Sequence, residues 1–286
     1  MQTTASIENI VRICHHRTMK VLIVLTLVCW GSPANAEDVS DILNRFVVAQ
    51  RANDGEARRY TYVEHADFFT YEDGGKKLRK DRSEENEIIF VEGLQFKKLI
   101  SRNDQPLSAR EQADVEKHMQ ETAEYRRRHR QQTPGGRISF GRDHVDLGSN
   151  EDLLSLFDSR LVGEDEIRGH KAWVVELTPK AGLRPANEHE REVVKFRKKL
   201  WIEQMDYTAL KVIHTVVESG MFAKPGTTVT LEYERIPGGP YLAAFVAVDI
   251  HRQVGKEILP SGRTEYRNTR FQKFDVQSSI TIDKPQ

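Results

Sequence analysis

The first clear pattern of hydrophobic positions after residue 36 is helical. Apolar residues recur there at spacings of three and four, at Val39, Ile42, Leu43, Phe46, Val47 and Ala49. Asp38 or Ser40 can cap a helix that starts here, and Asn53-Asp54-Gly55 favours a turn after it. We therefore predict an amphipathic helix that begins near residue 38 and ends at Asn53-Asp54-Gly55.

A three-stranded meander is predicted next. Residues 58–65 are rich in aromatic and β-branched side chains, and 76–90 and 94–100 are the two strands that follow. Asp73-Gly74-Gly75 and Glu92-Gly93 separate them as short turns. Strands joined by such short turns pair antiparallel.

Two helices of unequal character are predicted in the middle of the chain. Ser108 and Glu111 form a capping box for a charged helix that runs to about Gln132 and has only a thin apolar stripe. A second helix, Glu151–Leu161, has a fuller apolar face made by Leu153, Leu154, Leu156, Phe157 and Leu161. We expect the second helix to pack on a sheet and the charged one to be mobile at its edge.

The rest of the chain reads as strand and turn. The predicted strands are 162–168, 172–177, 193–203, 209–218, 227–236, 241–254 and 263–276. With the meander they total about ten or eleven, mostly joined by short turns, so the fold class is α+β with a largely antiparallel sheet.

Residues 1–36 have the features of a secretory signal peptide. Lys20 precedes an uncharged run of ten residues, and Ala34-Asn35-Ala36 offers small residues for cleavage between Ala36 and Glu37. The run is shorter than the about 20 residues that span a bilayer, although an uncleaved anchor is the alternative. Met19 is a second natural start, which would make 1–18 a misassigned extension. We therefore expect the mature protein to be periplasmic. It would contain no cysteine, because Cys14 and Cys29 both lie in this leader.

The charge balance argues against a nucleic-acid partner. The chain has 43 basic and 43 acidic residues. Residues 1–36 hold three basic residues and one acidic residue, so the remainder carries 40 and 42, a net charge of −2. A protein that follows phosphates normally has a basic excess.

No catalytic pattern in the sequence predicts an enzyme, a metal site or a cofactor. The chain has no nucleophile elbow, P-loop or dinucleotide fingerprint. His189-Glu190 begins like a zinc-protease helix, but Val193 occupies the second histidine position, which favours a solvated loop or strand edge. His144 with Asp143 and Asp146 could bind a metal or act as acid and base, and a polar loop is the better interpretation.

The sharpest charge cluster is Arg126, Arg127, Arg128, His129 and Arg130. It could contact an anion, such as lipid headgroups or an acidic partner surface. The alternative, which we favour, is that these cations complement the helix dipole and stay in solvent.

The order of elements and two local motifs resemble the LolA/RseB-like superfamily of periplasmic lipoprotein carriers and lipid-binding sensors. Residues 162–180 look like that family's paired central strands with an "L-x-P-K" type tail, here Leu177-Thr178-Pro179-Lys180. Leu200-Trp201-Ile202-Glu203-Gln204, followed by Ala209-Leu210-Lys211-Val212, looks like its "L-W-I-D … P-x-K" hairpin, with Glu203 in the acidic place and Ala209 where proline is common.

The resemblance implies a single LolA-like domain over 37–286, with a charged helical insertion at about 101–136. Its fold would be a curved, largely antiparallel unclosed β-barrel of about 11 strands whose concave face is covered by helices. The implied function is a non-enzymatic carrier or binder of acylated ligands, a lipoprotein or a lipid, in lipoprotein sorting. The alternative is an envelope-stress sensor that binds an inner- or outer-membrane partner protein.

On this fold we expect two groups of contact residues. The hydrophobic ligand cavity would be lined by Tyr60, Tyr62, Leu153, Leu156, Phe157, Leu161, Trp173 and Trp201. The aromatic residues of 60–71 are by default core residues, as aromatics at alternating strand positions usually are. The anionic contact would involve Arg126, Arg127, Arg128 and Arg130.

Overall fold

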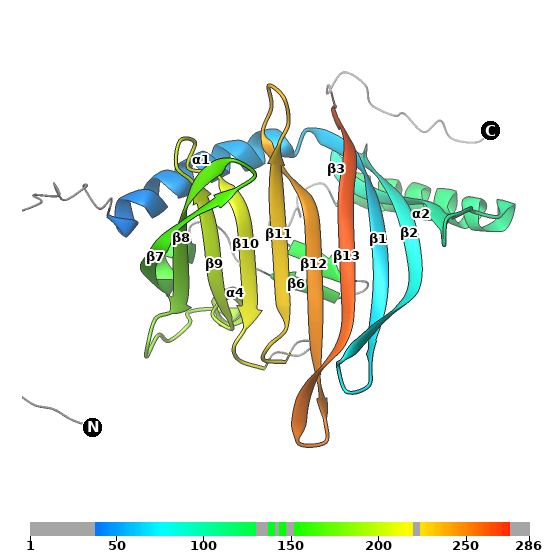
Figure 1. The fold of residues 1–286 in the computed structure, drawn as a ribbon. Coiled ribbons are helices and arrows are strands. Elements are labelled where there is room, and N and C mark those ends of the chain that lie inside the picture. The colour runs from blue at the N-terminus through cyan, green and yellow to red at the C-terminus, as the bar shows by residue number, and fades with distance from the viewer. Residues whose placement is uncertain (1–37, 130–136, 141–142, 147–151, 220–223, 275–286) are drawn as a thin grey trace, which may run out of the picture. The chain divides into compact units, whose positions relative to one another are not determined.

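The computed structural model describes residues 38–129, 137–140, 143–146, 152–219 and 224–274. Eleven strands form one antiparallel sheet in the order β4-β3-β2-β1-β13-β12-β11-β10-β9-β8-β7. Strands β4 and β7 are the two edges, so the sheet is not closed into a barrel. This confirms the predicted α+β class and the open antiparallel sheet (Figure 1).

The bounds of the elements follow. The strands of the large sheet are β1 (Tyr60–Glu72), β2 (Lys77–Val91), β3 (Leu94–Arg102), β4 (Gln105–Pro106), β7 (Phe157–Ile167), β8 (His170–Pro179), β9 (Phe196–Glu203), β10 (Ala209–Val216), β11 (Thr228–Arg235), β12 (Tyr241–Val254) and β13 (Glu257–Lys273). A separate hairpin pairs β5 (Arg137–Phe140) with β6 (Asp143–Asp146). The helices are α1 (Val39–Ala57), α2 (Ala109–Arg128), α3 (Asp152–Leu156) and α4 (Glu188–Val193).

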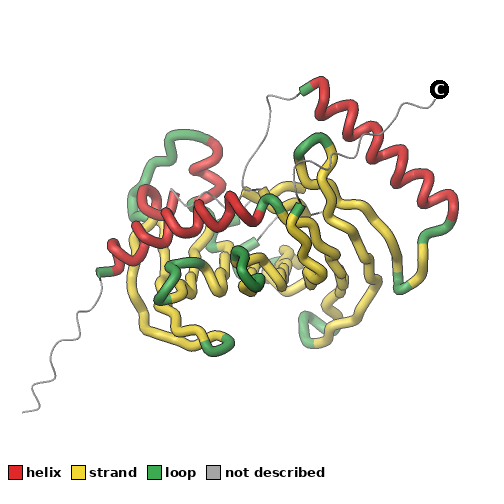
Figure 2. The backbone as a smooth tube through the Cα atoms, turned by 90° about the horizontal axis from the view of Figure 1, so that it is seen from above, coloured by secondary structure: helices red, strands yellow, loops and turns green. Residues whose placement is uncertain are grey.

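The sheet is continuous because the first and last strands meet in its middle. Strand β1 pairs with β13 along most of its length, from Tyr60 opposite Lys273 to Thr70 opposite Gly262. All other neighbouring strands of the large sheet are consecutive along the chain. Seen from above, the strands form an open arc with α1 inside it (Figure 2).

Helix α1 covers the concave face of the arc. Its buried side chains Ile42, Leu43, Phe46 and Val47 join the main hydrophobic core with residues of β7 to β10. Asp38, one of the two predicted caps, accepts a hydrogen bond from Ser40 N–H. The predicted end at Asn53-Asp54-Gly55 is wrong, because α1 continues to Ala57.

Helix α2 packs on the opposite face of β2 and β3. Its buried residues Met119 and Ala123 contact Val91 and Phe96, with Ile89 beside them. Those strand positions alternate with Ile88 and Lys97, which share the face of α1. The predicted capping box is present, with Ser108 as N-cap and Glu111 as its partner.

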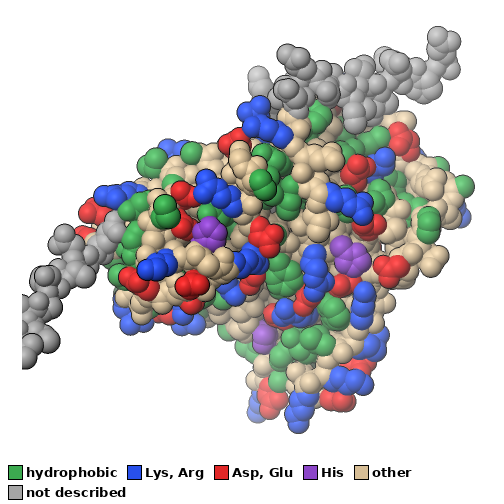
Figure 3. Space-filling view, turned by 45° about the horizontal axis from the view of Figure 1, so that its top comes forward, with side chains coloured by type: hydrophobic (Ala, Val, Ile, Leu, Met, Phe, Trp, Pro, Cys, Tyr) green, Lys and Arg blue, Asp and Glu red, His purple; other side chains and the backbone are tan. Residues whose placement is uncertain are grey.

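Figure 3 shows basic and acidic side chains interspersed over one face of the molecule.

Three predicted elements are corrected. The helix predicted at 151–161 ends at Leu156, and Phe157–Ile167 is strand β7, because this segment pairs with β8 from Phe157 opposite Pro179 onward. His189-Glu190 lies in a short helix, α4, whose N-cap Asn187 accepts from Glu190 N–H. The segment predicted as a polar loop, 143–146, is strand β6.

Candidate functional site

The concave face of β7 to β10 is filled by packed side chains. Leu156, Phe157 and Trp173 are three of the eight residues predicted to line a cavity, and all are less than 9% exposed in the core that α1 covers. Leu161 is partly buried against the same core. The side chain of Leu153 lies outside the described part of the chain. At this end of the sheet, α1 occupies the space that a ligand would need.

Trp201 lies on the other face of the sheet. It alternates with Leu200 and Ile202, which belong to the core under α1, whereas Trp201 packs with Ala172 and Tyr241. Its indole Nε1 donates to Asp165 Oδ2 at 2.9 Å. This hydrogen bond lowers the pKa of the Asp165 carboxyl. Trp201 is therefore separated from the concave face by the sheet itself.

Tyr60 and Tyr62 of β1, both predicted to line the ligand cavity, lie in different surroundings. Tyr60 is buried at the end of the strand, where a Cβ on Gly239 would lie 2.6 Å from its hydroxyl, so it packs against the turn between β11 and β12. The Tyr62 ring lies 5.6 Å from that of Phe271, between ring centroids. Burial, with the Glu64 charge adding to it, raises the pKa of Tyr62.

A second concave cluster is made by strand residues alone. Phe196, Val216, Val229 and Val248 are its buried members, and the partly buried side chains packed against them are Leu231, Val246, Ile250 and Tyr266. They come from β9 to β13, and no residue of a described helix belongs to the cluster. We call these eight residues the strand cluster. Sequence reasoning missed it, although Val246, Val248 and Ile250 alternate along β12 as residues of one face do.

Two nitrogen-bearing side chains lie beside the strand cluster. Lys198 and His214 face each other across β9 and β10, and both are less than 9% exposed. The Lys198 ammonium is 5.0 Å from the centroid of the Phe157 ring. Burial, and then the charge of Lys198, lowers the pKa of His214 well below its ordinary value. Among the described residues, His214 Nδ1 has no hydrogen-bond partner.

Charged groups border the strand cluster on its other side. Glu64 of β1 and Lys97 of β3 form an ion pair at 2.5 Å, and Lys97 Nζ lies 5.1 Å from the centroid of the Tyr266 ring. Burial, with the Glu64 and Glu84 charges adding to it, raises the pKa of Tyr266 to about 12. The concave face thus presents an apolar strip between two polar borders, Lys198 with His214 and Glu64 with Lys97.

The arginine cluster of α2 is largely engaged within the protein. Arg126 Nη1 donates to the carbonyls of Val91 and Leu94, and its Nη2 donates to that of Gln95. Arg127 pairs with Glu92 at 2.7 Å, and Arg128 pairs with Glu124 one helical turn away. Arg130 lies outside the described residues. Arg126 and Arg127 therefore fasten α2 to the hairpin between β2 and β3, which leaves them less available for an external anion.

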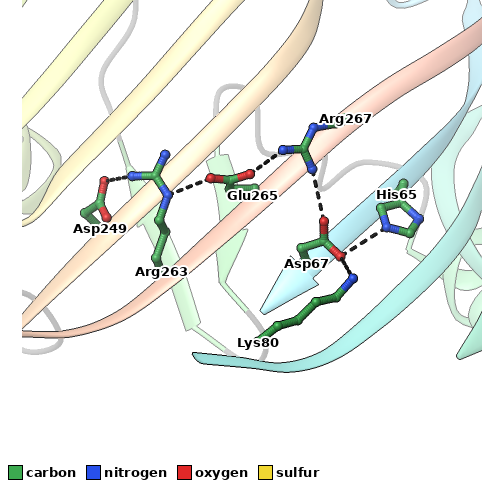
Figure 4. A network of polar contacts seen from close by, with 7 residues as sticks. All are labelled: His65, Asp67, Lys80, Asp249, Arg263, Glu265 and Arg267. Atoms are coloured by element: carbon green, nitrogen blue, oxygen red, sulfur yellow. Dashed lines mark hydrogen bonds and ion pairs between the residues drawn. The ribbon is translucent and has the colours of Figure 1, made fainter. Parts of the chain in front are cut away.

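The convex face carries a chain of ion pairs across four strands (Figure 4). Asp249 of β12 contacts Arg263, Arg263 and Arg267 flank Glu265, and Arg267 contacts Asp67 of β1. Asp67 also accepts from Lys80 of β2 and lies 3.1 Å from His65. Burial by itself would raise the pKa of Asp67, but its hydrogen bonds from Lys80 and His65 outweigh this and lower it. The opposite charges of this network neutralise one another, so we infer that its role is to hold the neighbouring strands together.

No reaction centre is apparent in the described part of the chain. No group of three or more His, Cys, Asp or Glu side chains there could hold a metal ion. His189 instead lies 3.0 Å from Asp152 across α4 and α3. The side chains of His144, Asp143 and Asp146 lie outside what the structure describes. Within the same described residues, none of the helices has the length and apolar character needed to cross a membrane.

Neither a protein-family model nor a curated protein matches this sequence. Solved structures do resemble it. A proposed outer membrane lipoprotein-sorting protein domain from Vibrio parahaemolyticus is 12% identical over 84% of this chain and 93% of that chain, with a TM-score of 0.38. A LolA superfamily protein from Nitrosomonas europaea is 11% identical over 83% and 94%, with a TM-score of 0.33.

A chain of the MucA/MucB complex from Pseudomonas aeruginosa is 13% identical to this protein over 83% of this chain and 99% of that chain, with a TM-score of 0.23. All three TM-scores are below 0.5, so we base the function on contacts within this chain.

Proposed function

We propose that this protein is an exported, non-enzymatic binding or carrier protein for an acylated ligand, a lipid or a lipoprotein, and that it acts in envelope lipoprotein sorting. The observation that supports it best is the strand cluster. An open curved sheet cannot fill its own hollow, and at β7 to β10 this protein fills it with α1. At β9 to β13 the apolar strip has no described helix on it.

The borders of the strip fit an amphiphile better than a purely apolar molecule. An acyl chain can lie along the partly buried Val246, Ile250 and Tyr266, while the polar end of the ligand reaches a charged border. Lys198 places an ammonium group at one border of that face, and Lys97, paired with Glu64, places one at the other. Burial of an acyl chain contributes about 0.8 kcal/mol per CH₂, so a strip of this kind binds without any covalent chemistry.

The test measures binding of a fluorescent fatty-acyl probe and compares two matched changes. Val246→Phe adds volume to the strip and should weaken probe binding about tenfold or more. Thr230→Phe adds a ring on the neighbouring strand but on the other face, since Thr230 pairs with Ala247, and should leave binding unchanged. Native mass spectrometry of the untreated protein should show bound lipid or lipopeptide. Protein without any bound lipid that also ignores the probe would contradict the proposal.

A second candidate function, binding of a membrane partner protein as a sensor, is supported by α2. This helix buries only Met119 and Ala123 and leaves its long charged side outward, with Tyr125 60% exposed. A carrier has no evident need for such a surface. Crosslinking from position 125 separates the two: a stoichiometric membrane-protein adduct favours the sensor, and labelling by lipoproteins alone favours the carrier.

A further inference from the structure

Two hairpins lie side by side at one end of the sheet and extend beyond the neighbouring strands (Figure 1). They are the turns β1–β2 and β12–β13. A Cβ on Gly75, which has φ +93, would lie 3.0 Å from Pro260 Cγ, so the two hairpins are in close contact. We call residues 72–80 and 252–260 the tip lobe.

The tip lobe exposes large apolar side chains. Leu78, Val254 and Ile258 are 41%, 57% and 38% exposed. They are three of the eight exposed large hydrophobic residues in the described part of the chain, gathered on two adjoining turns. Exposed apolar residues that gather in this way mark an interaction surface more often than scattered ones do.

The same lobe is basic in a chain whose formal net charge is zero. It holds six basic residues and three acidic ones. Lys76, Arg252 and Lys256 are exposed and have no ion pair with any described residue, whereas Arg79 pairs with Glu72. In the space-filling view, the lobe at the lower edge shows hydrophobic side chains with basic and some acidic side chains around them (Figure 3).

The orientation of the apolar residues favours a bilayer over a protein surface. Across β12–β13, Val254 lies opposite Glu257 and Ile258 lies opposite Gln253. Val254 and Ile258 therefore point to opposite faces of the hairpin, close to its turn. A protein partner would bury one face of the hairpin, whereas entry of the tip between lipid headgroups buries both.

We infer that the tip lobe docks this protein on an anionic membrane surface. The tip of β12–β13 enters the headgroup region through Val254 and Ile258, Leu78 on the adjoining β1–β2 hairpin adds a third apolar side chain, and the three unpaired cations contact anionic lipids. This inference does not depend on the bound cargo, and it gives a lipid-binding protein a defined end to present to the membrane.

The experiment is co-sedimentation of the full protein with vesicles of equal parts phosphatidylglycerol and phosphatidylcholine. The wild type should bind these vesicles, bind phosphatidylcholine vesicles weakly, and lose binding as salt is raised. Lys256→Glu should weaken binding about tenfold or more, because it removes a cation from the anionic surface and places a repelled carboxylate there. The double change Val254→Asp with Ile258→Asp should abolish binding.

Two control variants make the same kinds of substitution outside the tip lobe. Val48→Asp alters an apolar side chain on α1 that is 68% exposed, and Lys117→Glu alters an exposed lysine on α2. Both should bind vesicles like the wild type. Failure of the wild type to bind anionic vesicles, or equal loss in lobe and control variants, would overturn the inference. Capture of an acidic protein by a lobe that ignores vesicles would overturn it as well.

Discussion

Asn53 of α1 and Tyr241 of β12, 188 positions apart, are joined by a pair of buried hydrogen bonds. The Asn53 side-chain amide donates to the Tyr241 carbonyl at 2.9 Å, and Tyr241 N–H donates to Asn53 Oδ1 at 2.7 Å. A helix side chain thus takes the place of a strand neighbour for the first residue of β12. This contact fixes α1 across the end of the sheet.

Replacing Asn53 by Ala should lower the free energy of unfolding by about 2–4 kcal/mol, because it leaves one buried N–H and one buried carbonyl of Tyr241 without a partner. Denaturant unfolding followed by circular dichroism measures the loss. Val48→Ala on the exposed side of the same helix should change stability by less than about 0.5 kcal/mol. Equal effects of the two changes would show that the Asn53–Tyr241 contact contributes little.

Helix α1 also explains one error of sequence reasoning. Asn53-Asp54-Gly55 favours a turn locally, but Asn53 forms its hydrogen bonds with β12 and the helix continues. Periodicity and the capping box did predict α1 and α2, since both signals are local. The change from helix to strand at Phe157 could not be predicted from the spacing of apolar residues. It depends on pairing with β8, and the local spacing carries no information about that partner strand.

The candidate site was only partly predictable for a similar reason. Side chains alternate between the two faces of a strand, so Trp201 of β9 lies on the face opposite to Leu200 and Ile202. A stricter use of this two-residue period would have excluded Trp201 from the predicted cavity residues. The same period places Lys198 on the inner face with Leu200. No local pattern of residues indicates that α1 fills one half of the hollow of the sheet and that the strand cluster lies in the other half.

Phe157→Ala should destabilise the protein by about 3–5 kcal/mol, and Phe157→Asp should prevent folding. The ring is 3% exposed in the core under α1, so truncation leaves a cavity and an aspartate leaves a buried charge. Asp158→Ala, at the next and exposed position of β7, is the matched control and should be nearly neutral. Thermal unfolding of the purified Phe157→Ala and Asp158→Ala variants, together with the soluble yield of Phe157→Asp, tests this. A soluble, cooperatively folded Phe157→Asp variant would contradict the packing.

Arg126→Ala should lower the free energy of unfolding by about 1–3 kcal/mol, since three hairpin carbonyls lose their charged donor. Burial lowers the pKa of this guanidinium, which still keeps its charge at neutral pH. Arg128→Ala removes only an exposed pair within α2 and should cost less than about 0.5 kcal/mol. Urea unfolding compares them, and equal costs would contradict the role given to Arg126.

His214 should make stability depend on pH. Its pKa in the folded protein lies below the ordinary value of about 6.5, so the unfolded chain binds the proton more tightly. The stabilisation is complete above that ordinary pKa and is lost as pH falls below it, with a slope of at most about 1.4 kcal/mol per pH unit for one proton. His214→Gln should flatten the stability curve between about pH 7 and pH 5.

Hydrogen exchange should distinguish the two long helices. Helix α1 buries Ile42, Leu43, Phe46 and Val47 in the main core, and burial contributes roughly 1.5–3 kcal/mol for each large side chain. Helix α2 buries only Met119 and Ala123, although Arg102 pairs with Glu111 at one end and Arg126 holds the other. Local opening of α2 therefore exposes less apolar surface, and its central amides should exchange faster than those of α1. Arg126→Ala should accelerate exchange in α2 and leave α1 unchanged. If the centres of both helices exchange at one rate in the wild type, α2 opens only with the whole sheet, and the mobility predicted for it from its thin apolar stripe is wrong.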